Sequence, residues 1–460
     1  MDNFIKVAQV SAFLCLAVFA LPAVAQQAST QIEKALKVEG ARVTLPVGEA
    51  ITKDVFTPEW IDKARKSWDN FHFQMGGDHA LYYAMHLQEF MYSAESAPSM
   101  EYRPLERNIR PEIRNVRQQT SKGNITLEEY MNDTLYRAQG MMMIHKGKVV
   151  YESYPGMRPS DRHLTSSTGK ITCGLVIAQL IKEGKIDEKK NIADYIPELK
   201  NTAWDGVTVY SVANMCTALD NEETIEHILQ PDSPVTRFLA ACAGSPRATT
   251  GKLETWLEVA QDQQKLPGNE KQGEVFRYAS INTAILTKLA ENVENKNWGL
   301  IFEERVWSKV HARRSILFPL SPTGFALPLG FVAATLEDYT RFAAMFTPSW
   351  NAVSSERIVD EDLLKLFYDN IDKERYAKGA KLQTSIADFN EAAMGNALQW
   401  DFIWEDGAMA KSGNLCQMIY VDPKRDFASV FFSLTPFVDG YGEFKAGAFQ
   451  RAAAKMLNGE

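Results

Sequence analysis

Apolar residues gather into short runs near residue 140 and again near the C-terminal end of the chain. Residues 141–144 and 149–151 are apolar and flank a polar stretch, which predicts a β-hairpin. Residues 417–421 and 427–433 flank a segment whose Asp, Pro and Lys residues are typical of a turn. The pattern therefore predicts strands at both ends of the main part of the chain.

Helical patterns lie between and after these strands. Residues 171–181 are apolar on nearly all sides, which predicts a buried central helix, and Gly184 is placed to close it. Residues from about 190 to 310 are rich in helical patterns, and residues 444–457 form a predicted amphipathic helix. The simplest packing of this order is an α/β (α+β) fold, with one sheet, helices on its faces and an inserted all-helical region at about 190–310.

The first 25 residues follow a different pattern. Lys6 precedes an almost entirely apolar stretch from residue 10 to 21, and Ala23-Val24-Ala25 supplies the small residues that a signal peptidase reads. We expect residues 1–25 to be a cleaved secretory signal and the mature protein to be periplasmic or secreted. The apolar stretch is shorter than the roughly 20 residues that span a bilayer, and no later stretch is apolar enough, so no stable membrane span is expected.

The rest of the chain divides into a predicted N-terminal extension, residues 26–120, and a predicted catalytic domain, residues 121–460. The extension contains prolines and a charged stretch but no evident chemistry. It could cap a pocket, mediate dimerisation or cover a sheet face. The sequence leaves its role and the oligomeric state open.

The composition of the chain serves mainly to exclude classes of partner and cofactor. The 460 residues are 45% hydrophobic and 23% charged, enough for a large core, and the net charge of −8 is spread along the chain. An acidic surface repels phosphate backbones, so nucleic acid is not an expected partner. No C-x-x-C or H-E-x-x-H motif is present, so neither a metal nor another cofactor is expected. Four cysteines follow the predicted signal: Cys173, Cys216, Cys242 and Cys416. Four cysteines allow three complete disulfide pairings, and free buried thiols fit the sequence equally well.

The candidate chemistry begins just before the predicted buried helix. Ser167 and Lys170 are three residues apart, so at a helix start they share one face and the lysine amine can reach the serine hydroxyl. Free backbone N–H groups at a helix start also favour negative charge on Ser167. Lysine can act as the base only if its pKa falls, and burial beside an apolar helix favours that. Alone, an S-x-x-K pair is a weak signal.

Two further segments strengthen it. Tyr278 precedes a mostly apolar run and could relay a proton, although a half-buried structural tyrosine fits its spacing as well. Lys411-Ser412-Gly413-Asn414 leads directly into the predicted strand 417–421. A strand that carries a cation, a hydroxyl and a glycine can bind an anionic or carbonyl-bearing substrate. Its backbone N–H can complete an oxyanion hole with the N–H of Ser167.

The order of these segments resembles that of the serine β-lactamase and penicillin-binding protein superfamily. The chain is most similar to the branch of class C β-lactamases, related esterases and aminohexanoate-oligomer (nylon-oligomer) hydrolases, over roughly residues 125–460. Residues 143–152, 197–199 and 420–423 add to this likeness. The resemblance implies a β-lactamase/transpeptidase-like fold built on an antiparallel sheet. Two departures are the absence of S-D-N and the serine, Ser280, at the position where class C enzymes hold an asparagine.

The resemblance also implies residue roles. Ser167 would form an acyl-enzyme, while Lys170 and Tyr278 would shuttle its proton, with the main base left open between them. Asn282 would orient the substrate or Lys170. Lys411, Ser412 and Gly413 would bind the substrate. The backbone N–H groups of Ser167 and Asn414 would form the oxyanion hole.

The expected function is therefore hydrolysis of an amide or ester bond in a small-molecule substrate. A β-lactamase or a D-alanyl-D-alanine carboxypeptidase is the alternative within this class. A non-catalytic module that binds or senses cell-wall fragments is the alternative outside it. The sequence does not identify the natural substrate.

Overall fold

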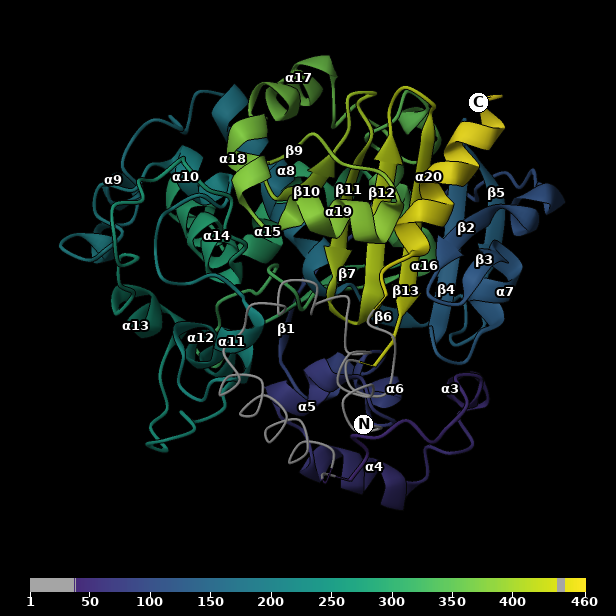
Figure 1. Cartoon of the computed structure of the whole chain (residues 1–460), viewed down its shortest axis with the longest axis horizontal. Helices are drawn as coiled ribbons and strands as arrows, with labels where there is room; N and C mark the ends of the chain where they lie inside the picture. Colours follow the sequence, from purple (N-terminus) through teal and green to yellow (C-terminus); the bar gives the residue numbers. More distant parts are fainter. Residues whose placement is uncertain (1–36, 38, 437–442) are drawn as a thin grey trace.

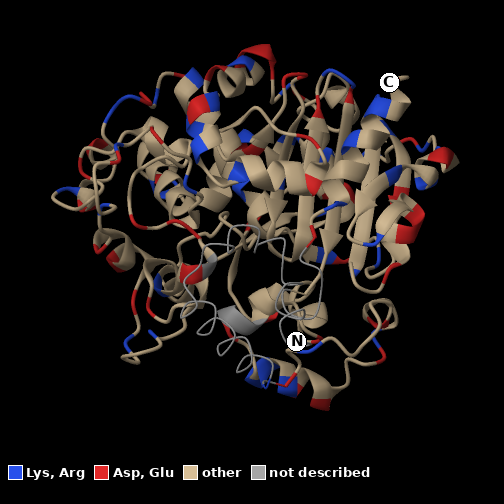
Figure 2. Ribbon diagram, viewed as in Figure 1, with Lys and Arg blue, Asp and Glu red and all other residues tan. Residues whose placement is uncertain are grey.

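The computed structural model describes residues 37, 39–436 and 443–460 (Figure 1). The predicted signal, residues 1–25, lies outside the described residues. Within the described ranges, no helix is long and apolar enough to cross a membrane. Charged residues of both signs are interspersed over the outer helices and loops, while most of the central sheet carries neither sign (Figure 2).

A seven-stranded antiparallel sheet forms the centre of the molecule, in the order β5-β4-β13-β12-β11-β10-β9. The predicted hairpin and both predicted C-terminal strands are confirmed, because β4 pairs with β5 and β12 with β13. Strand β13 also pairs with β4, which brings the C-terminal part of the chain beside residue 140. The strands are β4 Ala138–His145, β5 Lys148–Ser153, β9 Gly395–Ala397, β10 Trp400–Ile403, β11 Met409–Gly413, β12 Gln417–Asp422 and β13 Phe427–Ser433.

Both faces of this sheet are buried, because alternate side chains enter two different cores. Met142 and Val430 belong to one apolar cluster, whereas their neighbours Met141 and Phe431 belong to the other. Helices cover each face, as expected (Figure 1). They are α8 Lys170–Lys182, α14 Ser280–Glu294 and α16 Leu336–Ala344 on the first core, and α19 Lys381–Phe389 and α20 Ala446–Leu457 on the second.

The expectation of a single sheet is wrong. A second, four-stranded sheet has the order β1-β7-β8-β6, and a third consists of β2 and β3. These strands have only three or four residues each, too few for a clear alternation of apolar and polar positions. They are β1 Ser93–Ser96, β2 Arg117–Thr120, β3 Gly123–Thr126, β6 Arg162–Leu164, β7 Ile316–Pro319 and β8 Ala333–Thr335.

The predicted inserted helical region is present between α8 and β7. Its helices are α9 Ile192–Tyr195, α10 Val209–Ala213, α11 Ile225–Leu229, α12 Pro234–Ala243, α13 Trp256–Gln261, α14 and α15 Trp298–Arg305. The fold class expected from the sequence is confirmed. Helix α8 ends at Lys182, and Gly184 has φ +70°, the left-handed conformation that closes helices.

The segment before residue 120 is built into the rest of the fold. Its strand β1 pairs with β7, and its short helices pack below the ends of the central strands in Figure 1. These helices are α3 Glu49–Thr52, α4 Pro58–Lys66, α5 Asn70–Met75 and α6 Ala80–Tyr83. Three more helices complete the described fold: α7 Leu127–Asn132, α17 Glu361–Asp369 and α18 Lys373–Lys378. Cys173, Cys216, Cys242 and Cys416 are free and buried.

Candidate active site

Ser167 lies where the second sheet meets the central helix. Strand β6 ends at Leu164, and Ser167 follows in a 3₁₀ turn, η4 Ser166–Gly169, that runs directly into α8. In a 3₁₀ turn residues i and i+3 eclipse one another, which aligns Ser167 with Lys170. Lys170 Nζ accordingly lies 2.9 Å from Ser167 Oγ in a hydrogen bond. Ser166 has φ +47°, a left-handed conformation that is unusual for serine.

Lys170 has no exposed surface, and its Nζ also donates to the backbone oxygen of Leu329. Burial is the main cause that lowers the pKa of Lys170 to about 7. The Glu223 carboxylate opposes this shift, and the Lys411 ammonium adds to it. A buried lysine with a pKa near neutrality can exist as a free amine, the form that accepts a proton.

The Tyr278 ring lies among three lysines. The Nζ atoms of Lys170, Lys381 and Lys411 are 5.2, 4.9 and 4.8 Å from its centroid. Burial, followed by the Asp401 carboxylate, raises the pKa of Tyr278 well above its ordinary value. The phenol therefore keeps its proton at neutral pH and is placed to donate it.

Strand β11 brings Lys411 to the same place from the other side. Lys411 Nζ lies 2.6 Å from Asp401 Oδ1 on the neighbouring strand β10, and both side chains are almost completely buried. Burial lowers the pKa of Lys411 to about 8, while Asp401 opposes the shift. Burial acts to raise the pKa of Asp401, but Lys381 and Lys411 outweigh it and hold that pKa below its usual value. Lys381 Nζ is 3.3 Å from the second oxygen of Asp401.

The end of β11 lies against the backbone of Ser167. A Cβ atom on Gly413 would stand 2.9 Å from the Ser167 nitrogen, so only glycine allows this approach. Asn414 follows, and its Nδ2 donates to the backbone oxygen of Gln74 at 3.0 Å and to Gln74 Oε1 at 2.5 Å. The side chain of Asn414 is thus held by the N-terminal segment, next to the position predicted for an oxyanion hole.

The structure brings seven of the eight predicted site residues together through the contacts described above, but no described contact joins Asn282 to them. Asn282 is fully buried in the first turn of α14, and within the described residues its amide has no hydrogen-bond partner. The predicted contact of Asn282 with Lys170 is therefore not among the described hydrogen bonds. Ser412, by contrast, has its Oγ 3.4 Å from both Asp401 Oδ2 and Lys381 Nζ.

Four residues at the site were not predicted from the sequence: Asp401, Lys381, Glu223 and Gln74. Asp401 had a recognisable signal, because it is a lone carboxylate in the apolar run Trp400-Asp401-Phe402-Ile403. A charge in a buried strand needs a partner. Lys381 begins helix α19, a position where the sequence gives no reason to exclude a solvated surface lysine.

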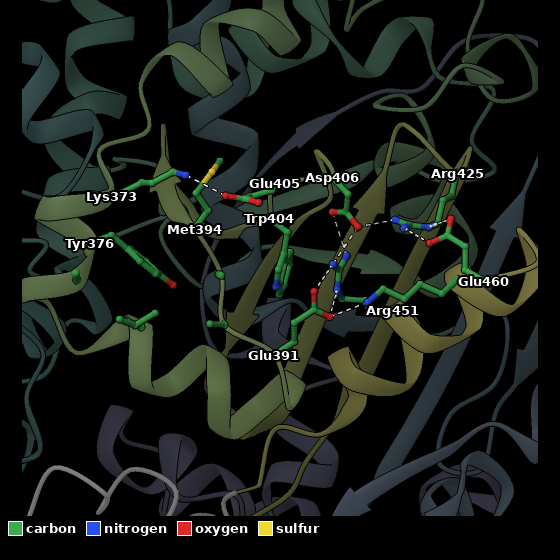
Figure 3. A pocket seen from close by; sticks show the side chains of 15 residues that line it. Lys373, Tyr376, Glu391, Met394, Trp404, Glu405, Asp406, Arg425, Arg451 and Glu460 are labelled. Atoms are coloured by element: carbon green, nitrogen blue, oxygen red, sulfur yellow. Dashed lines mark hydrogen bonds and ion pairs between the residues drawn. The ribbon is translucent and has the colours of Figure 1, made fainter.

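A separate hollow of about 570 Å³ lies between α18, α19 and α20 (Figure 3). Tyr376, Met394 and Trp404 line one part of it, and an ion-pair network lines the other. In that network Arg451 binds Glu391 at 2.7 Å and Asp406 at 3.0 Å. None of the eight predicted site residues borders this hollow. Among the described residues, no group of three or more His, Cys, Asp or Glu side chains is arranged to hold a metal ion.

Comparison with known proteins relates this geometry to a family. The family model described as Beta-lactamase matches residues 126–448. The 6-aminohexanoate-dimer hydrolase of Paenarthrobacter ureafaciens is 30% identical over 221 residues, which are 48% of this chain and 54% of that protein. The chain thus matches about half the length of that curated relative.

Solved structures agree in fold. A Bacillus anthracis structure named for 6-aminohexanoate-dimer hydrolase has a TM-score of 0.67 at 18% identity, over 90% of this chain and 99% of that one. EstCE1, described as a hydrolase with promiscuous acyltransferase activity, has a TM-score of 0.50 at 13% identity, over 72% and 96% of the two chains. The Bacillus match extends beyond the family model, because it covers most of the N-terminal segment as well.

Proposed function

The chain belongs to the beta-lactamase family, and from that premise we propose that it is a serine hydrolase that cleaves an amide or ester bond through an acyl-enzyme on Ser167. The observation that carries the proposal is the distance of 2.9 Å between the Nζ atom of buried Lys170 and Ser167 Oγ, which lets a neutral Lys170 accept the Ser167 proton. A serine needs a neighbouring base to become nucleophilic. A lysine whose pKa is about 7 supplies that base at neutral pH.

In the first step, neutral Lys170 accepts the Ser167 proton while Oγ forms a bond to the substrate carbonyl carbon. The carbonyl oxygen gains negative charge and is received by the backbone N–H groups of Ser167 and Asn414. Preorganised donors of this kind stabilise the transition state, and each contributes about 2.7–4 kcal/mol in enzymes where it has been removed. The close approach of Gly413 to the Ser167 nitrogen supports this assignment.

In the second step, the bond to the leaving group breaks and Tyr278 donates its phenolic proton to that group. The resulting phenolate is stabilised by the surrounding ammonium groups and then takes the proton held by Lys170. In a second cycle Lys170 accepts a proton from water while the water oxygen forms a bond to the acyl carbon; the bond from that carbon to Ser167 Oγ then breaks, and Oγ regains a proton from Lys170. Lys170 is therefore the proposed base and Tyr278 the proposed acid.

The substrate class follows from the family and its relative. We propose a small amide or ester, with aminohexanoate-type amides as the first candidates, because the curated relative is named for the hydrolysis of a 6-aminohexanoate dimer. A β-lactam or a D-alanyl-D-alanine peptide is the alternative.

We also propose that residues 1–25 are a cleaved export signal, because their apolar stretch and the small residues after it have the composition of such a signal. N-terminal sequencing of the mature protein tests it.

Intact-mass spectrometry after treatment with a fluorophosphonate, and separately with a penicillin, tests the nucleophile. We expect one fluorophosphonate adduct that maps to Ser167 and is lost in Ser167→Ala. Ser160→Ala removes an exposed serine seven residues earlier in the chain and serves as the matched control that keeps the adduct. A lasting penicillin adduct would favour a penicillin-binding protein. No adduct with either reagent would contradict a catalytic Ser167 and favour a binding module.

A further inference from the structure

The charges around Tyr278 do not pair one to one. Of the three described lysines around Tyr278, Lys381 and Lys411 lie within ion-pair distance of Asp401, and no other described carboxylate is as near to any of the three. Asp401 Oδ1 lies 2.6 Å from Lys411 Nζ. Glu223 acts on these lysines from farther away, and its Oε1 accepts the Ser280 backbone N–H at 2.5 Å. When Lys170 is a neutral base, two ammonium groups still share one adjacent carboxylate. Within ion-pair distance, positive charge therefore exceeds negative charge by one at this site.

Lys381 is the cation that an anion can reach. Its side chain is 17% exposed, whereas those of Lys411 and Asp401 are 0% and 1% exposed. Its contacts with polar atoms are also the longest of the set, at 3.3 Å to Asp401 Oδ2 and 3.4 Å to Ser412 Oγ. Contacts of this length lie beyond the usual range of hydrogen bonds, so Lys381 makes no optimal bond within the described structure.

The position of Lys381 is nonetheless defined by packing. Its Nζ lies 4.9 Å from the centroid of the Tyr278 ring and 5.2 Å from that of Phe402. Tyr376 Oη donates to the Lys381 backbone oxygen at 3.2 Å. Gly379, two residues earlier, packs so closely on Phe276 that a Cβ atom would stand 2.5 Å from the Phe276 oxygen. The ammonium group is thus held beside the reacting residues and is not a freely moving surface charge.

We propose that Lys381 Nζ and Ser412 Oγ form a subsite for a carboxylate of the substrate, so that the enzyme prefers amides or esters carrying a carboxylate near the scissile bond. This inference rests on the proposed function and narrows its substrate class. Helix α19 begins at Lys381 and has no side-chain cap at its N-terminus, which adds favourable positive potential for an anion. Lys411 cannot take this role directly, because it is buried and already bound to Asp401.

Two matched pairs of esters test the subsite. 4-Nitrophenyl hydrogen glutarate and its methyl ester differ in whether the carboxylate on the acyl side is free or methylated, and their uncatalysed rates are subtracted because the free carboxylate can attack its own aryl ester. 4-Acetoxybenzoate and methyl 4-acetoxybenzoate differ only by a carboxylate on the leaving group. We measure kcat and KM for all four with the full-length enzyme, Lys381→Met, Lys381→Arg and the control Lys378→Met, which removes an exposed lysine from the neighbouring α18.

For at least one pair, we expect the charged ester to have the higher kcat/KM in the unmodified enzyme. Lys381→Met is expected to reduce the charged-to-neutral ratio about 10- to 100-fold, mainly through KM, because a partly buried charged hydrogen bond is lost. Lys381→Arg restores most of the ratio, and Lys378→Met leaves it unchanged.

Equal turnover of charged and neutral esters in both pairs would overturn the subsite. So would an equal loss for both members in Lys381→Met, which would indicate a structural role. Fluorophosphonate labelling of Ser167 separates this failure from that of the proposed function. If labelling and turnover of all four esters are absent, the hydrolase assignment fails and the subsite fails with it.

Discussion

Titration of Lys170 is expected to set the acidic limb of the rate profile. Burial brings its pKa from 10.5 to about 7, and only the neutral amine can accept the Ser167 proton. At pH 6 about one molecule in eleven holds the neutral form, so kcat/KM is expected to fall about tenfold for each pH unit below 7. A lysine with an ordinary pKa would place this limb more than three units higher.

Lys411 is expected to set the basic limb. Its pKa is about 8, and its ammonium group lies 4.8 Å from the Tyr278 ring, where it stabilises negative charge on the phenol. The two limbs together predict a narrow bell with its maximum between about pH 7 and 8. Because the two lysines influence each other, the limbs report the pair as a unit.

Asp401→Asn provides the perturbation. The Asp401 carboxylate raises the pKa of both Lys170 and Lys411, so its removal lowers both pKa values and moves both limbs towards lower pH. Stability is also expected to fall, because breaking one side of a buried ion pair costs about 3–5 kcal/mol while the remaining lysine stays charged. Deprotonation of Lys411 limits this loss as the pH rises.

The assay uses 4-nitrophenyl acetate, which has no ionisable group, at constant ionic strength from pH 5.5 to 9.5. Glu405→Gln is the matched control, because it removes one exposed carboxylate just beyond the same strand. A profile that is flat between pH 6 and 8 would refute Lys170 as the base. An acidic limb that moves to higher pH in Asp401→Asn would refute the electrostatic reasoning.

Three further substitutions test single contacts. Tyr278→Phe is expected to slow amide hydrolysis about 10²- to 10⁴-fold but 4-nitrophenyl ester hydrolysis much less, since nitrophenolate leaves without a proton; an equal loss on both substrates would count against Tyr278 as the acid. Gln74→Ala releases the Asn414 side chain and is expected to lower kcat about tenfold with little change in KM, as measured by steady-state kinetics. Gly413→Ala places a methyl group 2.9 Å from the Ser167 nitrogen and is expected to slow fluorophosphonate labelling at least about tenfold, while an unchanged labelling rate would contradict the close approach.

The helices and strands with long, uniform apolar patterns could be predicted from the sequence. Helix α8 and strands β4, β12 and β13 have continuous apolar runs, and each occurs where the pattern predicted it. The second sheet could not be predicted, because β8 is only Ala333–Thr335 and its pairing with β6 depends on residues about 170 positions away. Strands of that length are defined by their tertiary partners more than by their own residues.

The same distinction applies within the site. Ser167 and Lys170 share a local turn, so their contact could be predicted from spacing alone. Tyr278 and Lys411 could be added through the order of the segments, which is information carried by the family resemblance. Lys381 reaches Tyr278 only through the packing of α19 beneath β10, a tertiary arrangement that no local pattern reports.

Burial of the β11 lysine, Lys411, explains why the proposed carboxylate subsite uses a different lysine. Lys411 can be desolvated only because Asp401 lies beside it, and its side chain has no exposed surface. Its remaining influence on the reaction is electrostatic, through the pKa of Lys170 and through negative charge on Tyr278. Direct recognition of a charged substrate therefore falls to a lysine that keeps contact with solvent, and Lys381 is the described lysine at this site that does so. If the ester pairs give the expected result, Lys411 adjusts the pKa values of the reacting groups while Lys381 binds the substrate carboxylate, and both lysines pair with Asp401.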